Sequence, residues 1–100
     1  MLKRKLIWSS RAKIELLEIL NFYKKRNGNA NYSRKFYTRT EELLELSRTH
    51  SFVGKRTDFE NVRVLIVDDY LIFYEVSNVE ITVLTIWGSR RNPEDLQIRK

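Results

Sequence analysis

The sequence predicts an α+β fold: an N-terminal strand, an antiparallel two-helix hairpin, and a three-stranded antiparallel meander that completes one small, mostly antiparallel sheet. Residues 11–49 hold two stretches with apolar side chains at three- and four-residue spacing, which is typical of amphipathic helices. Residues 62–87 hold three almost continuous apolar runs, which is typical of strands covered on both faces. With 100 residues, three glycines and one proline, residues 1–100 are expected to form a single domain.

The first helix is expected to follow directly after the first strand. Residues 3–8 end in an apolar run and read as a strand, and Ser9 or Ser10 then supplies a hydroxyl that can accept from the free amides of a first helical turn. Helical periodicity continues over residues 11–26, and Gly28 is expected to end the helix in a left-handed conformation. The three basic residues before that end suit the negative pole of the helix dipole, and a nucleic-acid contact is their second interpretation.

A second helix is expected over residues 31–49, joined to the first by a loop so short that the pair should form an antiparallel hairpin. Both helices also carry apolar side chains off their main stripes. These side chains either seal the hairpin against itself or form a groove for an amphipathic segment of a partner. They are Ile14 and Leu17 on the first helix and Tyr37 and Leu44 on the second.

The second half of the chain is expected to form the meander. Residues 51–61 read as a loop, and a two-residue turn at Asp68 and Asp69 is short enough to join antiparallel neighbours. Strands are expected at residues 62–67, 70–76 and 80–87, with Asn78 in the second turn. In the basic tail that follows, Pro93 can begin a short helical turn.

Composition excludes some classes of site. The chain has no cysteine, which excludes disulfides and cysteine-bound zinc, and its single histidine, His50, is expected at the surface or in a cap. No metal and no cofactor are therefore expected.

The apolar run near the start is too short for a signal peptide or a membrane span, so a cytoplasmic protein without a membrane partner is expected. The net charge of +6 indicates either an anionic partner or simple solubility.

Nearly the whole chain carries an ordered set of features. They are the opening Leu6-Ile7-Trp8-Ser9 with Ala12, the helical hairpin, Gly54-Lys55, Val62-Arg63-Val64-Leu65-Ile66, Tyr70-Leu71-Ile72-Phe73-Tyr74-Glu75-Val76, and Leu84-Thr85-Ile86-Trp87-Gly88-Ser89-Arg90-Arg91-Asn92-Pro93. In this order they resemble the RelE/ParE superfamily of bacterial type II toxin–antitoxin toxins. The resemblance implies a toxin held inactive by an antitoxin encoded beside it. It also implies one of two targets, because family members either cleave messenger RNA on the ribosome or inhibit DNA gyrase.

Metal-independent RNA cleavage needs a base, an acid and cations around one phosphate. Lys55 and Arg63 match basic positions of the family, and Arg90 and Arg91 follow the last strand. Arginine suits a phosphate because its planar fork donates two parallel bonds. Tyr74 is the candidate acid, since residues 88–100 lack the histidine or tyrosine that ribonuclease members commonly place there. Arg63 has an alternative role as the partner of Glu75 on the next strand.

Three hypotheses follow. The first is a toxin that inhibits gyrase by binding, without enzymatic activity. The second is a ribosome-dependent endoribonuclease that uses the four cations, and the third is a basic nucleic-acid-binding domain without toxicity. All three expect the cations to converge at one edge of the sheet. A chain of this charge also favours an acidic, partly disordered antitoxin that folds on binding.

Overall fold

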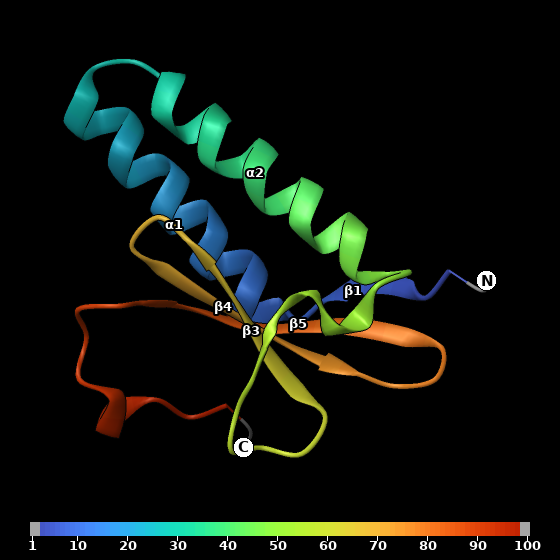
Figure 1. Cartoon of the computed structure of the whole chain (residues 1–100). Helices are drawn as coiled ribbons and strands as arrows, with labels where there is room; N and C mark the ends of the chain where they lie inside the picture. The colour runs from blue at the N-terminus through green and yellow to red at the C-terminus, as the bar shows by residue number, and fades with distance from the viewer. Residues whose placement is uncertain (1–2, 99–100) are drawn as a thin grey trace.

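The computed structural model describes residues 3–98 and has an α+β architecture in which two helices lie on one face of a five-stranded sheet (Figure 1). Its elements are β1 (Lys5–Trp8), α1 (Ser10–Asn27), α2 (Asn31–Ser47), the 3-10 turn η1 (Ser51–Val53), β2 (Lys55–Arg56), β3 (Val62–Val67), β4 (Tyr70–Val76), β5 (Glu80–Gly88) and the 3-10 turn η2 (Pro93–Asp95). The fold class, the hairpin and the meander are confirmed. Two short elements, η1 and β2, stand where a plain loop was expected.

The sheet is mixed. Its order is β1-β5-β4-β3-β2, in which β1 pairs with β5 in parallel and the other neighbours are antiparallel. The chain enters β1 at one edge, crosses the face in the two helices and returns to the far edge at β2. β5, the last strand, then fills the place beside β1, so the two ends of the sequence meet in the sheet.

The predicted helix boundaries rest on identifiable caps. The Ser9 hydroxyl accepts a hydrogen bond from the Ala12 amide at 3.0 Å, and Gly28 ends α1 with a φ of 72°. Both predictions are confirmed. α2 ends at Ser47, two residues before the predicted Thr49, and its last carbonyls accept hydrogen bonds from the following turn.

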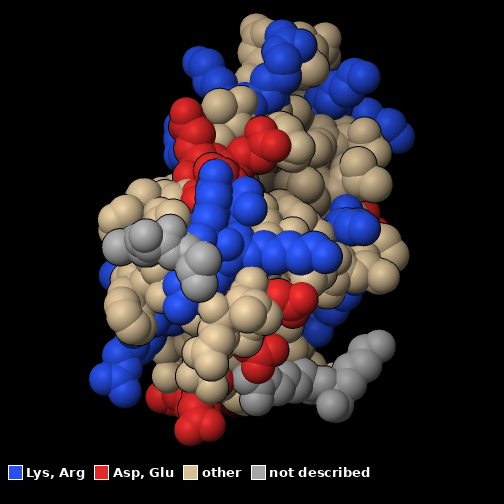
Figure 2. Space-filling view, turned by 90° about the vertical axis from the view of Figure 1, so that its right-hand side faces the viewer, with Lys and Arg blue, Asp and Glu red and all other residues tan. Residues whose placement is uncertain are grey.

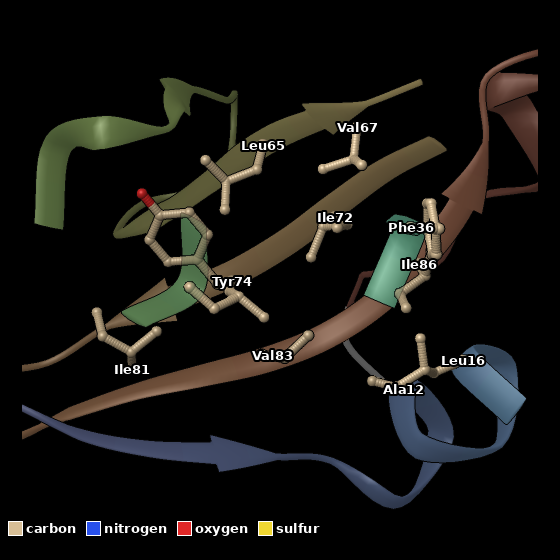
Figure 3. Packing of buried hydrophobic residues seen from close by; sticks show 11 residues of the cluster. Ala12, Leu16, Phe36, Leu65, Val67, Ile72, Tyr74, Ile81, Val83 and Ile86 are labelled. Carbon is tan, nitrogen blue, oxygen red and sulfur yellow. The ribbon is translucent and has the colours of Figure 1, made fainter. Parts of the chain in front are cut away.

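The main core lies between the hairpin and the sheet (Figure 3). Helical side chains such as Ala12, Leu16 and Phe36 meet the side chains that the strands direct toward the helices. Those strand residues are Leu65, Val67, Ile72, Tyr74, Ile81, Val83 and Ile86. In the described part of the chain, neither helix has an apolar stretch long enough to cross a membrane.

The opposite face of the sheet is covered by the tail. The tail leaves β5, passes through η2 and brings Leu96 and Ile98 against Val62, Phe73 and Trp87. The Arg11 guanidinium, at the start of α1, donates a hydrogen bond to the Gln97 carbonyl and so ties the tail to the helical layer. This second cluster explains why the strands are apolar at successive positions.

Candidate functional site

The segment between α2 and β3 is held by a buried tyrosine. Tyr74 has no exposed surface, and its hydroxyl accepts a hydrogen bond from the Gly54 amide at 2.9 Å and donates one to the Ser51 carbonyl at 2.8 Å. Burial raises the pKa of the Tyr74 hydroxyl, while the Gly54 amide and the Arg63 charge act in the opposite direction. Sequence reasoning proposed Tyr74 as a general acid. The structure corrects this, because both hydrogen-bonding partners of the hydroxyl are backbone groups within the core.

Gly54 is required by this contact. A Cβ at this position would lie 2.7 Å from the Tyr74 hydroxyl oxygen and 2.9 Å from the Val64 carbonyl oxygen. Both distances are far inside van der Waals contact. The Gly54-Lys55 pair noted in the sequence therefore places a backbone turn directly on the tyrosine ring.

Arg63 lies under the same turn. The sheet register pairs it with Tyr74, and Glu75 pairs with the preceding residue, Val62, so the Arg63 and Glu75 side chains leave opposite faces. The Arg63 guanidinium donates to the Gly54 carbonyl at 2.8 Å and sits 4.5 Å from the centre of the exposed Phe52 ring. Part of its hydrogen-bonding capacity is therefore used to hold the turn.

A depression of about 930 Å³ opens beside Arg63 at this end of the sheet. Its lining holds both signs of charge, and basic and acidic side chains also lie side by side on the face shown in Figure 2. The charged lining residues are Arg4, Arg56 and Arg63 with Asp58, Glu60, Glu75 and Glu80. Three cations against four acids do not make a concentrated phosphate site. Lys55 is exposed on β2 and is not among the described residues that line the depression.

Arg90 and Arg91 lie at the other end of the sheet. They follow β5, where the Ser89 amide donates to the Asp69 carbonyl in the β3–β4 turn at 2.8 Å. The Arg91 guanidinium carbon is 3.7 Å from the centre of the Trp87 ring, and Arg90 is exposed.

The register separates the two arginine groups. Gly88 pairs with Tyr70 and Arg63 pairs with Tyr74, so these levels of the sheet are four residues, or about 13 Å, apart along β4. The expectation that Lys55, Arg63 and Arg90 converge is therefore corrected. The predicted antiparallel meander already implies this separation, because strands 62–67 and 80–87 run in the same direction, so the start of the first and the end of the last lie at opposite ends of the sheet.

A second candidate surface is an apolar groove of about 380 Å³ between α1, α2 and β1. Leu17 is 59% exposed and lines it together with Tyr37, whose hydroxyl donates to Glu41 at 3.1 Å. Leu44 also lines the groove, but it has no exposed surface and packs in the core at the floor of the groove. Ile14 is 58% exposed on α1 but does not line the groove.

Sequence reasoning missed several groove and turn residues. Leu6 and Trp8 of β1 form part of the groove, and Phe52 stacks on Arg63. The apolar end of β1 was a visible signal, but its place beside the helices depends on the parallel pairing with β5. In the described residues, no three histidine or acidic side chains gather as metal ligands would.

The sequence of the chain matches the sequence model of a known protein family. The sequence model of the family described as "ParE toxin of type II toxin-antitoxin system, parDE" matches residues 6–93. The chain belongs to the ParE toxin family.

A solved structure supports the fold of this ParE-family chain. It comes from the chromosomal ParDE toxin–antitoxin system of P. aeruginosa and shares 19% sequence identity, with a TM-score of 0.58. The match covers 86% of this chain and 96% of the other. No curated protein matches the sequence. The resemblance to the RelE/ParE superfamily inferred from the sequence is confirmed.

Proposed function

We propose that this chain arrests bacterial growth by binding DNA gyrase, and that it does not cleave messenger RNA. Membership of the ParE toxin family supports the role of toxin in a type II toxin–antitoxin pair. Gyrase inhibition is one of the two activities implied by the wider superfamily resemblance. It needs a binding surface and no acid–base pair.

The observation that carries this choice is the position of Tyr74 relative to the cations. A metal-independent ribonuclease gathers a base, an acid and cations within hydrogen-bond reach of one phosphate. Here the Tyr74 hydroxyl is buried between two backbone groups, and Arg63 borders a depression rich in acids. Arg91 lies on Trp87, whose level in the sheet is three residues, or about 10 Å, farther along β4. This arrangement favours binding over cleavage.

The apolar groove supports an antitoxin partner, and we assign it to an amphipathic segment of the antitoxin. The groove is lined mostly by apolar side chains, and burying such surface contributes about 25 cal/mol per Å². Exposed Lys13 stands at its rim, where it can meet an acidic side chain of the partner. An antitoxin bound here would cover Leu17 and Tyr37.

The test is to induce the chain in bacteria and to inspect DNA and messenger RNA from the same cells. The proposal predicts relaxed or cleaved DNA with a DNA-damage response, while translated messages stay intact. Early cuts within translated messages would favour the ribonuclease. Normal growth with soluble, folded protein would contradict both toxin hypotheses.

A further inference from the structure

The net charge of the chain is concentrated in one place. Residues 19–40, at the tip of the helical hairpin, carry six basic side chains and no acidic one. The remaining residues hold 13 basic and 13 acidic side chains, because 19 minus six leaves 13. The whole charge of +6 therefore belongs to the tip. Its cations are Lys24, Lys25, Arg26, Arg34, Lys35 and Arg39.

These side chains are accessible. All six are exposed, and the tip extends beyond the sheet at the upper left of Figure 1. At the top of Figure 2, the charged side chains in view are basic. Arg39 pairs with Asp68, and Arg34 donates to the Asn31 side chain at 2.8 Å. Within residues 3–98, the remaining four cations form no ion pair.

Helix stability accounts for only half of this charge. Lys24, Lys25 and Arg26 lie in the last turn of α1, where cations complement the helix dipole. Arg34 and Lys35 lie near the start of α2, where the dipole favours acids, and the first turn of α2 contains none. Cations there oppose the dipole. A binding role explains their presence better than folding does.

The surroundings favour the backbone of a duplex over unpaired bases. Proteins that bind single strands offer aromatic rings on which bases stack. At this end of the molecule Tyr23, Tyr32, Phe36 and Tyr70 pack against one another beneath the tip. Of the aromatic side chains in residues 19–40, Phe22 is exposed at the edge of this ring cluster, and Tyr37 is exposed but lies in the lining of the apolar groove. Charge without a stacking platform suits phosphates.

We propose that the hairpin tip binds the phosphates of duplex DNA, so that the toxin meets gyrase together with its DNA substrate. The link to gyrase rests on the proposed function, whereas DNA binding by the tip can be measured without gyrase.

The test measures binding of the full chain to a 5′-labelled duplex of about 30 base pairs by fluorescence anisotropy at several salt concentrations. The test variant is Arg34→Gln with Lys35→Gln, which removes two cations that oppose the dipole and so should not unfold α2. The matched control is Lys5→Gln with Arg56→Gln, two exposed cations at the opposite end of the sheet. Both variants lower the net charge by two.

Each lost phosphate contact should reduce the slope of log affinity against log salt by about 0.9, so the test variant should lose about 1.8. The control should keep the wild-type slope. Equal slopes for the test variant and wild type would overturn the proposal, as would binding to single-stranded RNA without binding to the duplex. Gyrase inhibition measured on the same preparations separates the two claims, because it can persist when DNA binding by the tip is absent.

Discussion

The Glu15 carboxylate accepts a hydrogen bond from the Ile86 backbone amide at 2.9 Å, and the same oxygen accepts one from the Thr85 hydroxyl at 2.7 Å. β1 pairs with β5 only as far as Val83, so the edge of β5 beyond that point lacks a neighbouring strand. A side chain from α1 takes the place of that strand. Glu15 thus joins the helical layer to the sheet where the sheet edge would otherwise be open.

Replacing Glu15 with alanine should lower the free energy of unfolding by about 1–3 kcal/mol, because it leaves the Ile86 amide and the buried Thr85 hydroxyl without an acceptor. Glu15→Gln keeps an acceptor oxygen and should lose less. Urea denaturation measures both. If the alanine variant matched wild type within about 0.5 kcal/mol, the edge contact would not contribute to stability.

Replacing Tyr74 with phenylalanine separates structure from catalysis. The variant leaves the Gly54 amide and the Ser51 carbonyl unpaired in the core, so stability should fall by about 1–3 kcal/mol. The Gly54 amide should also exchange with solvent faster, as measured by NMR. Growth arrest should persist at a temperature where the variant is folded. A folded but harmless variant would restore Tyr74 as a catalytic candidate.

Deprotonation of buried and partly buried tyrosine hydroxyls should destabilise the fold at alkaline pH. Burial, followed by the hydrogen bond to Asp68, raises the pKa of Tyr32, and burial also raises the pKa of Tyr70 and Tyr74. A folded-state pKa above the unfolded value of about 10 gives stability that is complete below pH 10 and is lost as pH rises toward the folded value. Urea denaturation across this range should show the loss.

Tyr32→Phe provides the control for that pH dependence. The variant lacks one of the raised groups, so its stability should fall less steeply above about pH 10 than that of wild type. Identical slopes for the two proteins would mean that Tyr32 does not contribute. Asp68 would also lose one partner in this variant and would keep Arg39.

The groove has a matched pair of residues for testing antitoxin binding. Leu17 and Ile14 are on the same helix and are 59% and 58% exposed, but only Leu17 lines the groove. Leu17→Glu should weaken the complex with the antitoxin by about 2 kcal/mol or more, as expected for a buried anchor, whereas Ile14→Glu should have little effect. Isothermal titration calorimetry distinguishes them. Equal losses would place the antitoxin elsewhere on the helices.

Local signals in the sequence predicted most of the fold. Ser9 before an amphipathic stretch and Gly28 after it correspond to the observed caps, because capping depends on neighbouring residues only. β2 was not predicted, since two residues carry no periodicity. From the sequence, the tail was described as basic, and no role was assigned to Leu96 and Ile98, which cover a face of the sheet.

The separation of the arginines could have been drawn from the predicted meander. Since β3 and β5 both run antiparallel to β4, Arg63 near the start of β3 and Arg91 after the end of β5 lie at opposite ends of the sheet. The burial of individual helix residues was harder to predict. Leu44 could not be separated from Tyr37 by helical spacing alone, since both lie off the main stripe and only packing against β1 and the sheet buries one of them.

Inhibition of gyrase by binding can be measured in a supercoiling assay with purified gyrase and relaxed plasmid. The folded chain should block supercoiling or accumulate cleaved plasmid, whereas heat-denatured chain should do neither. Unimpaired supercoiling at a large molar excess of folded chain, together with cleavage of messenger RNA on translating ribosomes, would contradict gyrase inhibition.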